Sequence, residues 1–151
     1  MFDVFKKIKG WYSKITKPVG YNVYKASKAK TLKSKIKSDK YDTSELIKLA
    51  EMLDADGIHY NFVICEEEKF KYYQIHSLLM FDSYTYIWDA VIGEGTYGAE
   101  DGLLEVFGYD LDDVIGWLPA DEAYEKIKVC ICNYLRKNGK HGYKRGWSTW
   151  I

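Results

Sequence analysis

Two runs of β-branched and aromatic residues flank a charged break in residues 58–78, which read IHYNFVICEEEKFKYYQIHSL. Residues of this kind favour extended strands, and a short charged segment between two such runs favours a turn. We therefore predict a hairpin whose two strands are Ile58–Cys65 and Phe70–Leu78. The same composition predicts further strands at Tyr84–Ile92 and Leu103–Phe107, and residues 116–118 could add a short edge.

Helical patterns lie on both sides of these strands. Residues 2–16 have apolar residues at helical spacing, which predicts an amphipathic helix that ends before Pro18. A helix at residues 43–54 is predicted by its apolar face, and Asp42 and Glu45 resemble a capping box. A third helix is expected from Pro119 to just before Gly139. The stripe of the first helix is Met1, Val4, Phe5, Ile8, Trp11, Tyr12 and Ile15, with Lys6, Lys7, Lys9 and Lys14 facing away.

Helices at both ends of consecutive short strands predict an α+β fold, with a mainly antiparallel sheet of about four strands. Residues 21–40 are rich in Lys and Ser, which indicates a marginal helix or a mobile basic arm. We therefore expect a basic helical arm at residues 1–40 and an α+β domain at 41–151, or one continuous domain. A basic amphipathic helix can pack on its own domain, lie on an anionic membrane or bind in a partner's groove.

Opposite charges are segregated along the chain, although 22 basic and 22 acidic residues cancel in total. Residues 1–40 carry a formal charge of +10, residues 41–125 carry −17, and residues 126–151 carry +7. The basic ends either fold over the acidic middle and neutralise it, or leave it open to a partner. Aromatic residues make up 17% of the chain, and such side chains serve both cores and interfaces.

The length of 151 residues fits one domain with a substantial core. Apolar runs are too short to span a bilayer, and the N-terminus has no signal-peptide pattern, so we expect a cytoplasmic protein without a membrane partner. Three cysteines in no framework spacing are typical of reduced thiols.

A glycine-rich loop at residues 93–98 reads GEGTYG and matches a nucleotide-binding pattern. A kinase loop would need a Lys on the following strand, but there is none between Lys71 and Lys126. A dinucleotide loop would need a helix to begin here, and Gly102 and Gly108 argue against one. We therefore interpret the segment as a strand connection whose glycines supply positive φ angles.

No motif indicates catalysis or metal binding. In a helix, Cys130 and Cys132 project about 160° apart, so we expect Cys130 in the core and Cys132 at the surface rather than on one zinc ion. There is neither a calcium-loop pattern nor a nucleophile motif. We predict no catalytic residue, no metal and no cofactor, and therefore a protein that is not an enzyme. A metal-dependent nuclease or hydrolase with clustered carboxylates is the weakest hypothesis.

Two charged surfaces are candidates for binding. An acidic array could imitate a nucleic-acid backbone and occupy a partner's basic channel; its residues are Glu66, Glu67, Glu68, Asp110, Asp112 and Asp113. Basic side chains combined with stackable rings could instead bind phosphates and bases. These residues are Lys28, Lys30, Lys33, Lys35, Lys37, Lys144, Arg145 and Trp147.

Residues 93–127 resemble the C-terminal segment of small proteins encoded by phages and prophages of low-GC Gram-positive bacteria. The resemblance lies in GEGTYGAEDGLLEVFG, from residue 93, and DDVIGWLPADEAYEKI, from residue 112. The matching positions are Tyr97, Gly98, Glu100, Gly102, Leu103, Leu104, Glu105, Gly116, Trp117 and Leu118. Phage accessory proteins of this size often bind and disable a host defence component, CRISPR effector nucleases among them.

Together, the charge segregation, the aromatic content and the resemblance predict a phage-type accessory protein. We expect it to bind a host protein in the cytoplasm, such as a nuclease or another nucleic-acid-binding complex, and to inhibit it in an anti-CRISPR-like way through an acidic or aromatic surface. The alternative is a nucleic-acid-binding module that uses the basic arm and the basic aromatic tail.

Overall fold

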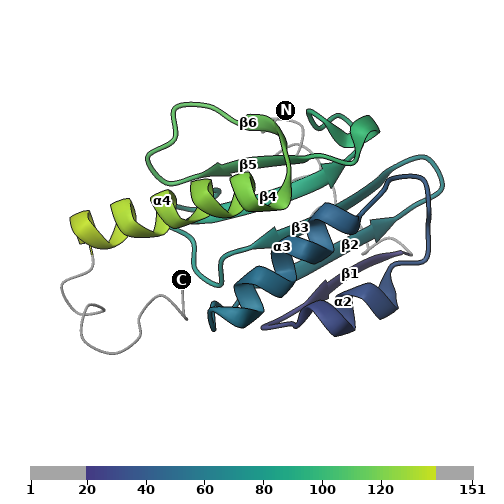
Figure 1. Ribbon diagram of the computed structural model, residues 1–151, viewed down its shortest axis with the longest axis horizontal. Helices are drawn as coiled ribbons and strands as arrows, with labels where there is room; N and C mark the ends of the chain where they lie inside the picture. The colour runs from purple at the N-terminus through teal and green to yellow at the C-terminus, as the bar shows by residue number, and fades with distance from the viewer. Residues whose placement is uncertain (1–19, 139–151) are drawn as a thin grey trace.

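Three helices pack on one face of a six-stranded antiparallel sheet in the computed structural model, which describes residues 20–138 (Figure 1). The elements in chain order are β1 (Tyr21–Tyr24), α2 (Ala29–Lys35), α3 (Ser44–Ala55), β2 (Asn61–Glu66), β3 (Lys71–His76), β4 (Trp88–Gly93), a 3₁₀ turn (Ala99–Asp101), β5 (Leu104–Gly108), β6 (Ile115–Leu118) and α4 (Ala120–Asn138). The helix predicted at residues 2–16 lies outside the described residues.

The strands form a meander in which each strand pairs with the next one along the chain. Tyr72 in β3 pairs with Gly93 at the end of β4, and Trp88 at the start of β4 pairs with Gly108. Successive turns therefore lie at alternate ends of the sheet. The β2–β3 turn and the β4–β5 connection share one end, and the β3–β4 and β5–β6 connections share the other.

The main core lies between the sheet and the helices. Strand alternation turns Phe62, Ile75 and Trp88 toward the helices, and these side chains are fully buried. Leu49 of α3 and Ile127 of α4 belong to the same buried cluster. Full burial of each such side chain contributes roughly 1.5–3 kcal/mol, so this interface is what holds the helices against the sheet.

The α+β class and the antiparallel sheet agree with the sequence prediction, but the strand count does not. The predicted number of about four strands is too low, because residues 21–24 were not predicted as a strand; β6 contains the short edge suggested at residues 116–118. Residues 21–24, predicted as a marginal helix or mobile arm, pair with β2 as an edge strand. Leu32 of α2 is fully buried in the main core, so residues 21–35 pack together with the rest of the sheet.

The predicted capping box at the start of α3 is also wrong. Thr43 is the N-cap residue and its side chain makes no capping hydrogen bond. Asp42 Oδ1 instead accepts hydrogen bonds from the backbone and the hydroxyl of Ser44. Glu45 accepts a hydrogen bond from the backbone N–H of Ala120 at 2.8 Å. Glu45 therefore caps α4 rather than its own helix, and it links the two helices at their N-termini.

Candidate functional site

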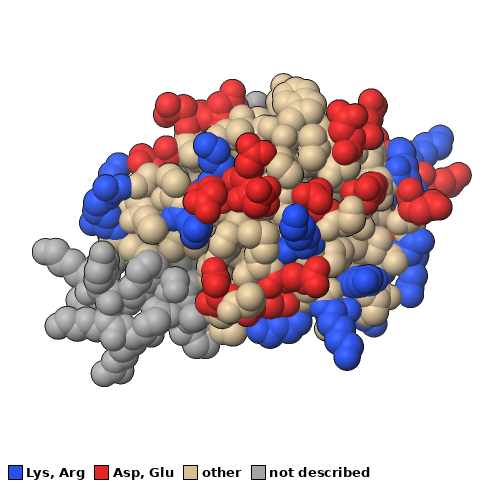
Figure 2. Space-filling model, viewed as in Figure 1, with Lys and Arg blue, Asp and Glu red and all other residues tan. Residues whose placement is uncertain are grey.

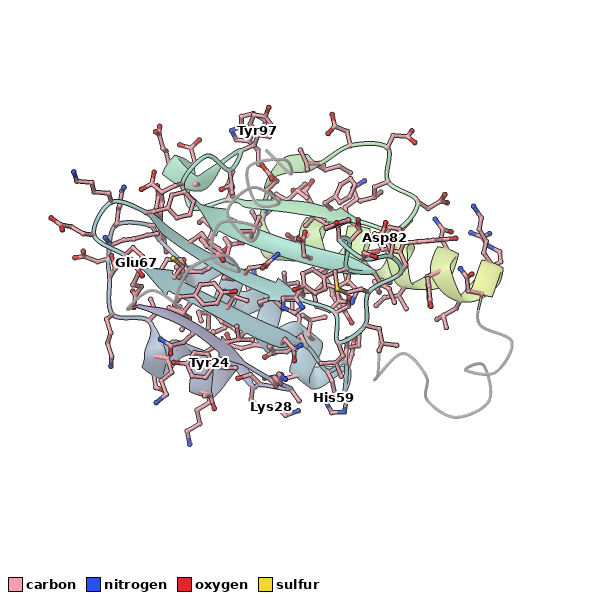
Figure 3. All side chains as sticks on the ribbon, turned by 180° about the vertical axis from the view of Figure 1, so that it is seen from behind. Tyr24, Lys28, His59, Glu67, Asp82 and Tyr97 are labelled. Carbon is pink, nitrogen blue, oxygen red and sulfur yellow. The ribbon has the colours of Figure 1, made fainter. Side chains whose placement is uncertain are left out.

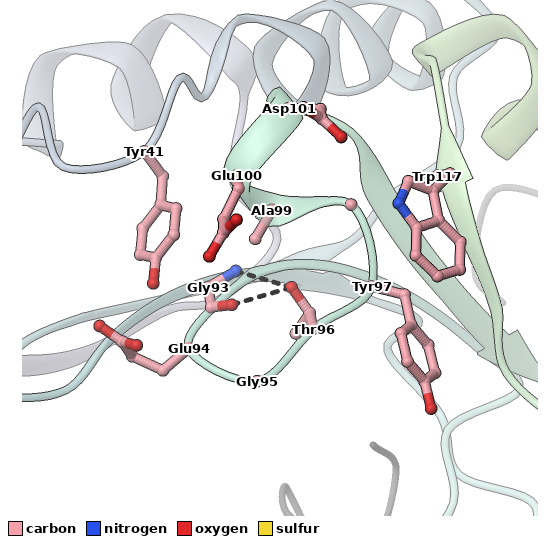
Figure 4. A pocket seen from close by; sticks show the side chains of 11 residues that line it. Tyr41, Gly93, Glu94, Gly95, Thr96, Tyr97, Ala99, Glu100, Asp101 and Trp117 are labelled. Carbon is pink, nitrogen blue, oxygen red and sulfur yellow. Dashed lines mark hydrogen bonds between the residues drawn. The ribbon is translucent and has the colours of Figure 1, made fainter.

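The β4–β5 connection is held in a defined shape by its glycines and by Thr96. Gly98 and Gly102 have φ angles of +97° and +70°, as the sequence predicts for glycines in this loop. The Thr96 hydroxyl accepts a hydrogen bond from the N–H of Gly93 and donates one to the carbonyl of Gly93 (Figure 4). The loop therefore turns back on the end of β4 rather than extending into solvent.

Two glycines allow this loop and β6 to pack closely together. A Cβ atom added at Gly98 would lie 2.9 Å from the Cα of Trp117, and one at Gly116 would lie 2.3 Å from the Cβ of Tyr97. The N–H of Trp117 donates a hydrogen bond to the carbonyl of Tyr97 at 3.2 Å. Side chains at either glycine would push the loop away from β6, so both positions require glycine.

This packing stacks the rings of Tyr97 and Trp117 at the surface (Figure 4). Their centroids are 5.1 Å apart and their planes differ by 23°. Both rings stay accessible, because Tyr97 is 39% exposed and Trp117 is 57% exposed. Trp117 also has a φ of +55°, a conformation that is costly for a bulky side chain. Exposed aromatic area and backbone strain at one residue are typical of functional positions.

Acidic residues line the same pocket as the aromatic pair. Glu94, Glu100 and Asp101 line a pocket of about 320 Å³ together with Tyr97 and Trp117 (Figure 4). We call these five residues the aromatic–acidic surface. Burial alone would raise the pKa of Glu94, but hydrogen bonds from Lys40 and Tyr41 outweigh it and lower the pKa. Glu94 is therefore ionised at neutral pH, and it forms an ion pair with Lys40.

A buried carboxyl group supports the loop from within. Glu105 of β5 is only 2% exposed, and its Oε2 atom accepts a hydrogen bond from the N–H of Tyr97 at 2.8 Å. Burial raises the pKa of Glu105 to about 7, although the hydrogen bond opposes the shift. The charges of Asp89 and Asp113 act in the same direction as burial. Glu105 is thus a structural anchor of the site rather than part of its accessible surface.

The predicted acidic array is divided between the two ends of the sheet. Glu66, Glu67 and Glu68 lie at the β2–β3 turn, whereas Asp110, Asp112 and Asp113 lie in the β5–β6 connection. Figure 3 shows the same separation, with Glu67 at one end of the sheet and Asp82 of the β3–β4 connection at the other. The structure therefore does not bring these six residues together as one patch.

Two members of the acidic array are engaged within the chain. The Glu66 carboxylate accepts hydrogen bonds from the N–H groups of Lys37 and Ser38 and from the hydroxyl of Tyr73. Asp110 forms an ion pair with Lys137 at 3.2 Å. The remaining residues leave only part of the predicted array open to a partner, with Glu68, Asp112 and Asp113 exposed.

The predicted basic residues fall into a described and an undescribed group. All five lysines from Lys28 to Lys37 are exposed on and around α2. Figure 2 shows basic side chains at the edge where α2 lies and also at the opposite end of this face, where α4 ends, with acidic side chains between the two groups. Lys30 and Lys33 line a groove with Glu51 and Asp54 of α3. Lys144, Arg145 and Trp147 lie outside the described residues.

A second group of exposed apolar side chains lies in the β3–β4 connection. Tyr84 is 68% exposed there, and the neighbouring exposed residues are Leu79, Met80 and Phe81. The Phe81 ring packs edge to face on Tyr109 in the β5–β6 connection, with centroids 5.0 Å apart. This group therefore lies at the end of the sheet opposite to Tyr97 and Trp117.

The sequence prediction identified the charged residues but missed Tyr97 and Trp117 as a site. The positions on which the sequence analysis based its expected resemblance to phage proteins include both rings, both packing glycines and Glu105. These residues are separated in the chain and meet at the loop–β6 contact. These positions therefore belong to one local structure.

The cysteines occupy three different environments. Cys130 is buried and Cys132 is exposed, as predicted from their helical spacing, and Cys65 is buried in the sheet. No group of three His, Cys, Asp or Glu side chains between residues 20 and 138 is arranged to hold a metal ion.

Comparison with known proteins found no matching family, curated protein or solved structure. Within the described part of the chain, no helix is long and apolar enough to cross a membrane.

Proposed function

We propose that this chain is a phage-type accessory protein that binds a host nucleic-acid-handling or defence protein through the aromatic–acidic surface and inhibits it. The observation that carries this proposal is the exposed Tyr97–Trp117 stack, which shares a pocket with three carboxylates. The proposal replaces the divided acidic array with residues that lie together.

The stacked pair has the properties of a binding hot spot. Trp and Tyr are enriched among residues that dominate binding energy, and two rings already held against each other lose little conformational freedom on binding. Trp117 also keeps its strained backbone although over half of its side chain contacts solvent. A site retained for stability alone would gain little from a tryptophan in this conformation.

The acidic residues of the aromatic–acidic surface favour a particular kind of partner. Glu100 and Asp101 are exposed and favour a positively charged surface, and exposed rings attract Arg and Lys side chains through cation–π contacts. Proteins that bind nucleic acid present such basic surfaces. The resemblance to phage proteins supports a host defence component, such as a CRISPR effector nuclease, as the target.

The test combines a biological assay with matched variants. The full chain should restore plaque formation on a Gram-positive host that carries active CRISPR immunity. Trp117→Gly and Tyr97→Ala should abolish this protection, and each should weaken binding to the captured target by about 30-fold or more. Tyr84→Ala is the control, because it removes an even more exposed ring at the opposite end of the sheet.

Two results would contradict the proposal. The first is full protection by the Trp117 and Tyr97 variants. The second is loss of protection in Tyr84→Ala alone, which would place the contact at the β3–β4 connection.

A second candidate function is supported by the lysines on and around α2. Five exposed lysines within ten residues, from Lys28 to Lys37, could neutralise phosphates of DNA or RNA. This function predicts that affinity falls by roughly one log unit per log unit of salt for each phosphate neutralised. The gel-retardation test compares wild type with Lys33→Glu. Unchanged mobility of DNA and RNA with wild-type protein at low salt would rule out this function.

A further inference from the structure

The face of the sheet that points away from the helices carries its own apolar cluster. Its buried members are Val63, Cys65, Tyr72 and Val91, with Tyr21 and Phe70 packed against them. Val63 is 2% exposed and Cys65 is fully buried. None of the described helices contributes a residue to this cluster. Figure 3 views the sheet from this side, with the helices behind it.

We call this side of the sheet the second face. An antiparallel sheet that exposes one face to water normally carries polar residues there. Here a row of paired residues crosses four strands, and it consists of Val63, Gln74, Val91 and Glu105. All four side chains are buried. Two of these residues are polar, yet they are buried, and such burial is typical of a covered interface rather than of a solvated surface.

An unsatisfied polar atom on the second face also indicates a covering partner. The Gln74 side chain is 1% exposed and donates a hydrogen bond from Nε2 to Asp89 Oδ2 at 2.8 Å. Its Oε1 atom is buried and accepts no hydrogen bond from the described residues. Buried acceptors of this kind are usually paired, so the covering group should bring a donor.

We propose that residues 1–19 of this chain bind to the second face as an amphipathic helix. The sequence predicts a helix at residues 2–16 with one apolar stripe that includes Phe5, Ile8 and Trp11. That stripe matches the apolar cluster in character, and the lysines on the opposite side remain in water. The Trp11 indole N–H and the Tyr12 hydroxyl are donors within the same stripe.

The position of the chain supports the same occupant. Gly20, the first described residue, accepts a hydrogen bond from the N–H of Glu66, so the segment joins the sheet at the end of β2. Tyr21, the next residue, already packs against the apolar cluster. A 15-residue helix is about 22 Å long, and six strands span about 24 Å. The segment therefore begins at the second face and is long enough to cross it.

The three cysteines provide a test in the full chain. Thiol labelling of wild type should modify Cys132 rapidly and leave Cys65 and Cys130 protected. Ile8→Asp places a charge in the apolar stripe, and we expect it to raise the labelling rate of Cys65 by about tenfold or more. Cys130, on the buried side of α4 in the main core, should stay protected. Lys7→Asp is the matched control, because it introduces the same side chain on the polar side.

Rapid labelling of Cys65 in wild type, or an equal rate in Ile8→Asp, would overturn the proposal. If Cys130 also reacts in Ile8→Asp, the variant has unfolded and the decision passes to a second measurement. In that measurement, a photoreactive benzoylphenylalanine replaces Phe5 in an otherwise wild-type chain. Crosslinks within one chain to β2, β3 or β4 would support the proposal.

Crosslinks from position 5 to α2, α3 or α4 would refute the proposal. Crosslinks found only at the mass of a dimer would also refute it, because a second copy of the chain would then cover the second face. The outcome is independent of the aromatic–acidic surface, because neither Tyr97 nor Trp117 is altered in these experiments.

Discussion

The left-handed backbone at Trp117 makes a prediction that reverses an ordinary rule of strand stability. In a regular strand, Gly is less stable than Ala by about 0.5–1 kcal/mol, because Gly loses more backbone freedom on folding. Trp117 has a φ of +55°, where any residue with a Cβ atom costs roughly 1–2 kcal/mol. Ala retains that cost and Gly removes it. We therefore expect Trp117→Gly to be more stable than Trp117→Ala.

The size of the difference follows from these two terms. Removal of the steric cost outweighs the entropy cost of Gly. The free energy of unfolding of Trp117→Gly should therefore be higher than that of Trp117→Ala by about 0.5–1 kcal/mol. Both variants lose the stack on Tyr97, which is worth about 0.5–1.5 kcal/mol. Trp117→Ala should therefore unfold at lower denaturant concentration than wild type, while Trp117→Gly should remain close to it.

The assay is urea and thermal unfolding of the three proteins, with Val23 as the control position. Val23 lies in the edge strand β1, is partly exposed, and has no positive φ. At Val23 the usual order should hold, with Ala more stable than Gly. In a chain of this length, 1 kcal/mol corresponds to about 2–4 °C in Tm, so both differences are measurable. If the Ala variant is more stable than the Gly variant at position 117 as well as at position 23, the backbone at Trp117 is not strained.

Three further predictions concern groups around the site. Glu105→Gln should flatten the pH dependence of stability. The folded-state pKa of about 7 lies above the usual value of 4.5. The protonated Glu105 side chain therefore contributes fully to folding stability below pH 4.5, and this contribution is lost as the pH rises to 7. Urea unfolding at pH 8 should show Glu105→Gln more stable than wild type by up to about 3 kcal/mol, and an unchanged pH slope would contradict this. Gly116→Ala should cost about 1–3 kcal/mol in thermal unfolding, because its Cβ would meet Tyr97, and an unchanged Tm would argue against the close packing. Glu66→Gln should cost about 1–3 kcal/mol through lost hydrogen bonds, whereas the exposed Glu68→Gln should stay within about 0.5 kcal/mol; equal effects would show that Glu66 is not an internal anchor.

Strands rich in β-branched and aromatic residues were predictable, whereas the edge strand β1 was not. The hairpin of β2 and β3 follows from two apolar runs with a charged break, and such runs determine strands locally. β1 has only four residues, and Asn22 and Val23 are exposed. Its pairing depends on the open edge of β2, about forty residues further along the chain. A local pattern cannot contain that information, so the segment was predicted as a helix or mobile arm.

The aromatic–acidic surface could be predicted only in part, for a similar reason. The glycines in the loop indicate positive φ angles, but the stack of Tyr97 on Trp117 depends on where β6 lies against the loop. That position follows a register shift in the pairing of β5 with β6, between Leu104 and Val106. Registers are determined by packing across strands, so the partner of Tyr97 emerges only from the assembled sheet.

The meander explains why the net negative charge of residues 41–125 did not indicate which acidic residues lie together in the structure. Consecutive antiparallel strands reverse direction, so connections separated by one strand lie at opposite ends and connections separated by two strands share an end. The N–H of Glu94 accordingly bonds to the carbonyl of Lys71 at the β2–β3 end, while Phe81 contacts Tyr109 at the other end. Once the strands are assigned, counting them therefore places Glu66 with Glu94 and Asp110 with the apolar β3–β4 connection. A partner that binds one end of this sheet meets carboxylates around a stacked ring pair, and a partner at the other end meets carboxylates around an apolar loop.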